Sequence, residues 1–228
     1  MGEKIQQTMM IGFSVLFLAF VASAYGASIK DSNDFLDHVL LQKMPALVRR
    51  TAKLYPNATI GEFKFTVERT GITNRELKVK MKQGAIRGFD TGVHRVGDCG
   101  PVTAIGFDAS LSCTVDFSGI NATFMAKVEG DNLLATDKRI PITVNVVDTV
   151  GRFEAMSSGR LTKVRTFHID KIRFNTQYDR QLNLNAARRS KFIEEVEKKV
   201  NHELYTLLYN DYLQLLNEAV AAAHFPRL

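Results

Sequence analysis

The middle of the chain alternates apolar and polar residues with a period of two. Phe63 and Phe65 are separated by a lysine, and Leu77 and Val79 are each followed by one. A strand that alternates in this way has one apolar and one polar face, as in antiparallel sheets with one side in water. From about Ile60 to Leu184 the pattern predicts such a sheet. Further alternating rows contain Phe124, Ile142, Val144, Phe167 and Ile169.

Two segments with helical spacing flank this region. The first carries Phe35, Leu36 and Val39, and Pro45 interrupts it, so we expect a kink or two abutting helices there. The second begins after Asn185, a residue type that caps helices. If it is helical from 186 to 223, it is ~57 Å long at ~1.5 Å per residue. Its apolar stripe contains Phe192, Val196, Val200, Leu204, Leu207 and Leu208.

A helix of this length must bury its stripe against an equally long apolar surface, which the dry face of the sheet provides. The predicted fold is therefore α+β: a long, strongly curved antiparallel β-sheet wrapped around the long C-terminal helix, with the N-terminal helix alongside. A solid core and a core with a cavity both fit, because alternation shows a dry face without showing what it encloses. The residues predicted to line an apolar site there are Phe63, Phe65, Leu77, Val79, Phe124, Ile142, Val144, Phe167, Ile169, Val200, Leu204, Leu207 and Leu208.

The first residues predict export. A lysine at position 4 precedes the apolar run 9–21, and small residues follow. This is the order of a secretory signal peptide, so we expect removal of residues 1–24, with cleavage after Ala24 or close by after Gly26 or Ala27. The run is shorter than the ~20 residues of a membrane-spanning helix, and no later stretch is long enough. Residues 25–228 are expected to form a single secreted, extracellular domain.

An exported chain with two cysteines is expected to form a disulfide, here between Cys99 and Cys113. A bridge that closes a loop of about 15 residues stabilises a fold by roughly 3 kcal/mol on the chain-entropy account. Two sequons make Asn57 and Asn121 candidate glycosylation sites.

The chain has a formal net charge of +6. A secreted basic protein is not expected to meet nucleic acid, and its natural anionic partners are lipid head groups, sulfated glycans and acidic protein surfaces. A solvated basic surface without a partner is the plainer interpretation, and strong salt dependence of binding would argue against it. Basic residues cluster at Arg49-Arg50, Lys138-Arg139, Arg160-Lys163-Arg165 and Arg188-Arg189-Lys191.

Fragments that resemble catalytic or metal-binding motifs are incomplete. Asp90-Thr91-Gly92 matches aspartic proteases, which need two such carboxylates, and the chain has no second copy. Cys99 stands where the similar loop of trypsin-like proteases has its serine. His202-Glu203 begins an H-E-x-x-H zinc pattern, but Thr206 occupies the position of the second histidine. We therefore expect no enzymatic activity, no cofactor and no metal site.

The order of elements resembles that of the tubular lipid-binding superfamily: an export signal, an amphipathic helix, a run of alternating strands and a long C-terminal amphipathic helix. The resemblance covers nearly the whole mature chain and rests on architecture. Within the superfamily the chain is similar to mite group 7 allergens and to arthropod juvenile-hormone-binding and takeout-like proteins. The hormone-binding branch has an N-terminal cysteine pair that this chain lacks between Ser28 and Leu54, which favours the group 7-like branch. The resemblance implies a groove or tube that accepts lipids or bacterial lipid products, without catalytic residues.

The sequence thus supports two functional hypotheses. The first is a secreted carrier or sensor that binds a lipid or other apolar ligand between the helix and the curved sheet. The second is a secreted interaction module with a solid core, whose basic surface binds a partner protein, a glycan or an anionic lipid.

Overall fold

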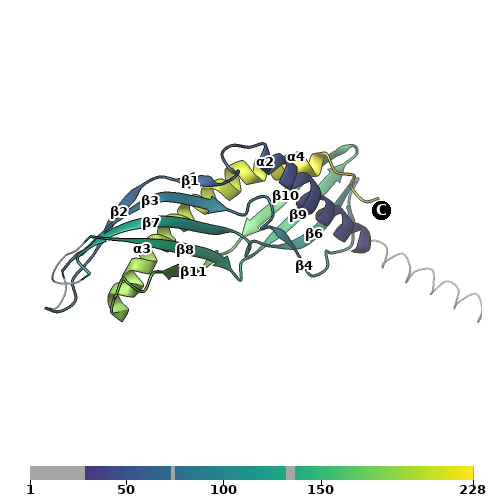
Figure 1. Ribbon diagram of the computed structural model, residues 1–228. Helices are drawn as coiled ribbons and strands as arrows, with labels where there is room; N and C mark the ends of the chain where they lie inside the picture. The colour runs from purple at the N-terminus through teal and green to yellow at the C-terminus, as the bar shows by residue number, and fades with distance from the viewer. Residues whose placement is uncertain (1–28, 73–74, 132–136, 228) are drawn as a thin grey trace, which may run out of the picture.

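The structure is a computed structural model that describes residues 29–72, 75–131 and 137–227. Its described strands form two antiparallel sheets, arranged end to end in an elongated molecule (Figure 1). The six-stranded sheet contains β1 (Ala58–Ile60), β2 (Phe63–Val67), β3 (Leu77–Arg87), β7 (Asn121–Glu129), β8 (Lys138–Val147) and β11 (Arg173–Tyr178). The five-stranded sheet contains β4 (His94–Val96), β5 (Thr103–Ile105), β6 (Asp108–Asp116), β9 (Val150–Ser158) and β10 (Leu161–Ile169).

The order of strands in the six-stranded sheet is β1-β3-β7-β8-β11, and β2 pairs with the other end of β3. The order in the five-stranded sheet is β10-β9-β6-β4, and β5 pairs with the other end of β6. Strand β3 is bulged between Lys82 and Ala85, where Gln83 has a φ of 51°. Because a bulge bends a strand and increases its twist, this irregularity contributes to the curvature of the sheet.

Both helical segments contain a π-helical turn. The N-terminal helix, residues 29–38, continues through η1 (Val39–Lys43) into α2 (Met44–Arg49). The interruption expected at Pro45 therefore takes the form of a π turn just before the proline, which lies in the first turn of α2. The C-terminal segment consists of α3 (Ala186–Leu207), η2 (Leu208–Tyr212) and α4 (Leu213–Ala221). No helix within the described ranges is both long and apolar enough to cross a membrane.

The predicted fold class is confirmed. Helix α3 runs along the curved six-stranded sheet, and α4 continues over the five-stranded sheet beside α2 (Figure 1). The predicted cap is also confirmed, because the side chain of Asn185 accepts a hydrogen bond from the backbone N–H of Arg188 at 3.1 Å. The structure differs from the expectation of one long sheet, since the strands are divided between two.

The chain crosses between the sheets at a narrow junction, which we call the waist: residues 88–93, 117–120, 148–149 and 170–172. Gly92 and Gly119 are packed so closely there that a Cβ on Gly119 would lie 2.4 Å from the Cα of Gly92. Thr149 is fully buried and is hydrogen-bonded to two of the other segments that cross between the sheets. Its carbonyl accepts from the Phe117 N–H at 2.9 Å, and its hydroxyl oxygen accepts from the Arg173 N–H at 2.9 Å.

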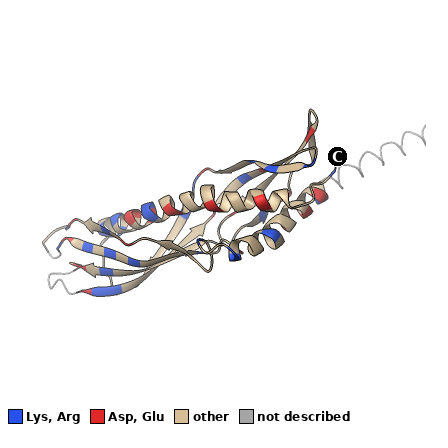
Figure 2. Cartoon of the chain, turned by 90° about the horizontal axis from the view of Figure 1, so that it is seen from above, with Lys and Arg blue, Asp and Glu red and all other residues tan. Residues whose placement is uncertain are grey.

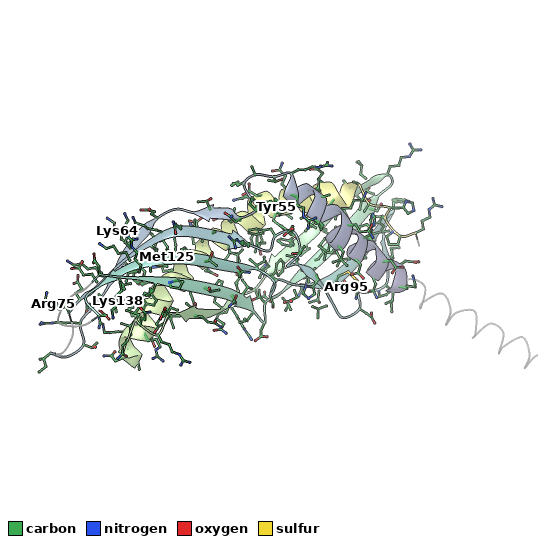
Figure 3. The ribbon with its side chains drawn as sticks, in the orientation of Figure 1. Tyr55, Lys64, Arg75, Arg95, Met125 and Lys138 are labelled. Carbon is green, nitrogen blue, oxygen red and sulfur yellow. A yellow bond between two sulfur atoms is a disulfide. The ribbon has the colours of Figure 1, made fainter. Side chains whose placement is uncertain are left out.

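The N-terminal helix is fixed to the five-stranded sheet by polar contacts and the disulfide loop. Arg95 of β4 makes two hydrogen bonds to the carboxylate of Asp37, at 3.0 and 2.7 Å (Figure 3). The side chain of Asn33 accepts from the Cys99 N–H at 2.8 Å. Cys99 and Cys113 are joined, as expected, so the bridge links this loop to β6. The helix and the disulfide therefore belong to the same half of the molecule.

Candidate apolar-ligand site

Helix α3 closes the open side of the curved six-stranded sheet. It contacts both outer strands, β2 and β11. The ring of Phe192 on α3 lies 5.7 Å from that of Phe65 on β2 and 5.2 Å from that of Tyr178 on β11. On the β11 side the hydroxyl of Thr176 also donates to a carboxylate oxygen of Glu197 at 2.7 Å. Phe192 therefore bridges the two edges of the sheet and seals its interior.

The inner face of the sheet is apolar, as the alternation predicts. Every second residue of β7 and β8, and of β3 on each side of its bulge, points inward and is buried, while the other residues face water or lie half-exposed. The predicted residues found on this face, all at most 4% exposed, are Leu77, Val79, Phe124, Ile142 and Val144. Val200 and Leu204 are buried on the α3 side. The two apolar surfaces therefore meet; the cavity predicted between them stays a prediction.

Phe63 and Phe65 lie at the edge of this interior. Both are half-buried, and their rings stack with centroids 6.1 Å apart. Phe63 also contacts the buried Phe124 edge-on at 5.8 Å. We call this line of rings, Phe63, Phe65 and Phe192, the β2–α3 seam. It leads from solvent toward the inner face without a charged side chain among its members.

The opposite side of α3 is hollowed at the surface. A groove of about 620 Å³ follows the junction of β11 and α3. Its apolar wall includes Tyr178 and Ile193, and its basic residues are Arg180 and Arg189. Because Tyr178 also touches Phe192, the groove adjoins the ring that seals the interior. Its composition suits a molecule with an apolar body and an anionic end.

The structure places the predicted lining residues in two groups. Phe167 and Ile169 belong to β10, in the five-stranded sheet, and pack near the end of α3 and η2. The Ile169 N–H donates to the hydroxyl of Tyr209 at 2.9 Å, and the Phe167 ring lies 5.7 Å from that of Tyr209. Leu207 and Leu208 are buried where α3 passes into η2. The prediction that all these residues form one lining is therefore wrong. One group lies in the interior under α3, and the other forms a separate aromatic cluster near the waist.

Several aromatic residues of these groups were not predicted as lining. The helical stripe includes Phe192, but its spacing does not predict that this residue joins both edges of the sheet. Tyr212 is buried against Phe89 and Phe167, with ring centroids 6.3 Å from each. Burial raises the pKa of Tyr212, which keeps its hydroxyl neutral. The π turn shifts the phase of the helix, so a stripe drawn at 3.6 residues per turn misses Tyr209 and Tyr212.

Other predicted sites have different outcomes. Asn57 and Asn121 are both half-exposed, Asn57 before β1 and Asn121 at the start of β7, and their glycosylation stays a prediction. The signal peptide, residues 1–24, lies outside the described residues. The basic cluster around Arg188 is not a continuous surface, because the Arg188 guanidinium is buried and donates to the carbonyls of Arg75 and Gly130 at 3.0 and 3.1 Å.

Comparison with known proteins gives one strong sequence match. The salivary anticoagulant protein P23 of Ixodes scapularis is 44% identical over 220 residues, which cover 96% of this chain and 99% of that protein. No protein-family model matches the sequence.

Two solved structures are also similar. Lipopolysaccharide binding protein aligns with a TM-score of 0.45 and 12% identity over 83% of this chain, which spans only 39% of that chain. Takeout 1 of Epiphyas postvittana aligns with a TM-score of 0.25 and 9% identity over 80% of this chain and 85% of that chain. On the sequence match over nearly its full length, the chain belongs to the family of the Ixodes scapularis salivary protein P23.

Proposed function

We propose that the chain is a secreted protein that binds a lipid or another apolar ligand under α3, and that it acts by binding rather than by catalysis. The observation that carries this proposal is the position of Phe192, which bridges both edges of the curved sheet between the half-buried β2–α3 seam and the groove at β11. At the seam the half-buried Phe63 contacts Phe124 of the inner face, so we infer that an apolar ligand would enter by displacing these rings. Ligand binding in such sites is driven mainly by burial of apolar area.

Mass spectrometry of an organic extract of the purified protein tests the proposal, because a bound lipid should be recovered in stoichiometric amount. A fluorescent fatty-acid probe gives a second measurement. Phe65→Glu places a charge at the seam and is expected to weaken probe binding by at least about tenfold. Thr66→Glu, one residue further on the outward face of the same strand, is the matched control and should bind as the wild type does. Empty protein that also ignores the probe would contradict the proposal.

The relative P23 is an anticoagulant by name, and we propose the same action for this chain. The expected result is a prolonged plasma clotting time that rises with protein concentration and saturates. A binding mechanism predicts a delay that does not grow with preincubation, whereas enzymatic destruction of a clotting component would make it grow. Normal clotting at saturating protein would rule out this part of the proposal.

A second candidate function, binding of a sulfated glycan, is favoured by one feature of the outer face. Four cations stand opposite one another across four strands: Lys64 pairs with Lys80, Lys80 with Lys127, and Lys127 with Arg139. We call this the cationic row. At the ~4.8 Å spacing of strands it is about 14 Å long. Like charges directly opposite one another destabilise a sheet, so the row costs stability that a linear polyanion would restore.

The surroundings of the cationic row favour a narrow anion. Lys80 pairs with Glu62 at 3.0 Å and Lys127 with Asp137 at 2.6 Å, whereas Lys64 and Arg139 make no ion pair with a described residue. A depression of about 560 Å³ on this face is lined by four lysines, Lys64, Lys78, Lys80 and Lys127, and by two acidic residues, Glu129 and Asp137. Figure 2 shows the basic residues banded across these strands. A row of cations in a depression is a better fit for a linear sulfated polysaccharide than for a flat anionic surface.

Chromatography on immobilised heparin tests this candidate. The double variant Lys64→Gln with Arg139→Gln should elute at clearly lower salt than the wild type, because fewer counterions are displaced. The variant Arg152→Gln with Lys171→Gln removes the same charge from exposed positions elsewhere and is the control. Equal elution of the two variants would show that only net charge matters.

A further inference from the structure

Two hairpin turns in the five-stranded sheet have the same length and the same position of glycine. Gly106-Phe107 joins β5 to β6 between the paired residues Ile105 and Asp108, and Gly159-Arg160 joins β9 to β10 between Ser158 and Leu161. Each is a two-residue turn whose glycine has a positive φ, 65° for Gly106 and 62° for Gly159. Glycine in the first of the two positions is the signature of a type II′ turn, in which only that first residue needs a positive φ.

The two turns lie next to each other. Strands β6 and β9 are paired, with Ala109 opposite Ser157, so the two hairpins are neighbours in one sheet. Both turns and the C-terminal tail border a single depression of about 520 Å³, lined among others by Phe107, Arg160 and His224. The tail ends at the same end of the elongated molecule (Figure 1). One end of the protein therefore presents two hairpin tips side by side.

These tips expose large apolar side chains. Phe107 is fully exposed, and Leu161 is 77% exposed. Neither side chain contributes to the core, and a polar residue at either position would satisfy the same turn. Ile105, at the base of the first turn, is also exposed. Solitary exposed apolar residues are ordinary, but several together at the tips of adjoining turns indicate a surface that is covered in use.

The charges around the tips are mainly positive. Arg160 sits on the second turn, Lys163 lies two residues beyond Leu161, and Arg227 lines the depression. The positive charge of Arg165 is not free for an anionic partner, because its guanidinium pairs with the Glu154 carboxylate at 3.0 Å. Asp108 is the one acidic residue among those that line the depression. Protruding apolar residues ringed by lysine and arginine match the interface of a membrane, where apolar groups enter the acyl boundary and cations meet phosphate.

We propose that this end of the protein docks on an anionic phospholipid surface, with Phe107 and Leu161 inserted and Arg160 and Lys163 at the level of the phosphates. The hairpin geometry makes insertion possible without unfolding, because Phe107 lies in a turn beyond the paired backbone and Leu161 is the first paired residue after the neighbouring turn. Insertion by ~5–10 Å, as for other interfacial segments, needs no other part of the molecule to move. The inference goes beyond the proposed function and does not depend on it, since it involves no residue of the β2–α3 seam.

The chain contains no tryptophan, which makes Phe107→Trp a unique fluorescent reporter. With vesicles of an equimolar mixture of phosphatidylcholine and phosphatidylserine, its emission is expected to shift to the blue and to be quenched by brominated acyl chains. Vesicles of phosphatidylcholine alone should give a much weaker change, and added salt should reverse binding. Emission that stays unchanged with the anionic vesicles would overturn the proposal and leave a protein surface as the occupant of these tips.

Vesicle co-sedimentation of the unlabelled protein supplies the second measurement. The double variant Phe107→Ser with Leu161→Ser should bind anionic vesicles at least about tenfold more weakly than the wild type. The matched control is Ile72→Ser, which removes an apolar side chain that is 92% exposed and lies beyond β2 in the other half of the molecule. Phe65→Glu should leave vesicle binding intact even if it abolishes probe binding, so the two proposals fail separately. Equal binding by the double variant and the wild type would overturn insertion.

Discussion

At the scale of single residues, Arg188 is the clearest case in which structure reassigns a side chain. It is 2% exposed and lies in the first turn of α3. Its guanidinium donates to the backbone carbonyls of Arg75 and Gly130, which belong to the segments next to β3 and β7. Burial lowers the pKa of Arg188, and the nearby Asp131 carboxylate acts in the opposite direction. The residue therefore anchors the start of α3 to the end of the six-stranded sheet.

Arg188→Met keeps most of the side chain volume but removes every donor. Carbonyls that lose their partner while buried are costly, so the free energy of unfolding should fall by about 2–4 kcal/mol. Arg189→Met, at the exposed neighbouring position, is the control and should change stability by less than about 0.5 kcal/mol. Urea denaturation followed by circular dichroism measures both. Equal stability of the two variants would show that the buried hydrogen bonds contribute nothing.

At the scale of elements, the contact between α4 and β10 includes one polar side chain, that of Asn217. Pairing of β10 with β9 shifts register between Val164 and Thr166. The Val164 N–H donates instead to the side-chain oxygen of Asn217 at 3.1 Å. The amide of Asn217 in turn donates to the Leu213 carbonyl at 3.0 Å. Asn217 therefore satisfies backbone groups of both elements where the bulge would otherwise leave one unpaired.

Asn217→Leu should lower the free energy of unfolding by about 1–3 kcal/mol, because it leaves the Val164 N–H without an acceptor in a partly buried place. Gln214→Leu, on the exposed side of the same helix, makes the same kind of replacement without touching β10. Thermal unfolding by calorimetry distinguishes them. If both variants melt together, the hydrogen bond across the bulge is not a stabilising contact.

The sequence predicts the individual helices and strands well, but it does not predict which strands pair with one another. Alternation through Leu77 and Val79 predicted the buried face of β3, and Asn185 marked the start of α3. Alternation fixes which face of a strand is apolar, but it carries no signal of which strand pairs with which. For that reason the sequence assigns Phe167 and Phe124 to one apolar lining, although the two lie in different sheets.

The remaining differences also have physical causes. A helical stripe assumes a constant 3.6-residue period, so the π turn at η2 concealed Tyr209 and Tyr212. A cluster of basic residues reads as surface because charged groups are rarely buried, and Arg188 is an exception that backbone carbonyls from distant segments make possible. Those carbonyls belong to residues far away in the chain, so the local sequence around Arg188 cannot predict its burial.

At the scale of the whole molecule, the two sheets form halves with separate means of support. The six-stranded half is closed by α3 through Phe192. The five-stranded half carries the disulfide and the N-terminal helix, which Arg95 and Asp37 hold in place. The halves meet at the waist, where Thr149 joins the crossing segments. Because their supports differ, a perturbation of one half need not open the other.

Replacing both cysteines by serine tests this division. The Cys99–Cys113 bridge spans 14 residues of sequence, and removing it should cost the half that contains it roughly 3 kcal/mol on the chain-entropy account. Hydrogen exchange should then accelerate in β4, β5, β6 and the N-terminal helix, while β3, β7 and β8 keep their protection, because local opening follows cooperative units. Uniform acceleration through both sheets would mean that the waist couples the halves into one unit. The same variant also tests where the ligand binds. If the halves are separable, the cysteine variant still binds the apolar probe under α3 although its five-stranded half is destabilised.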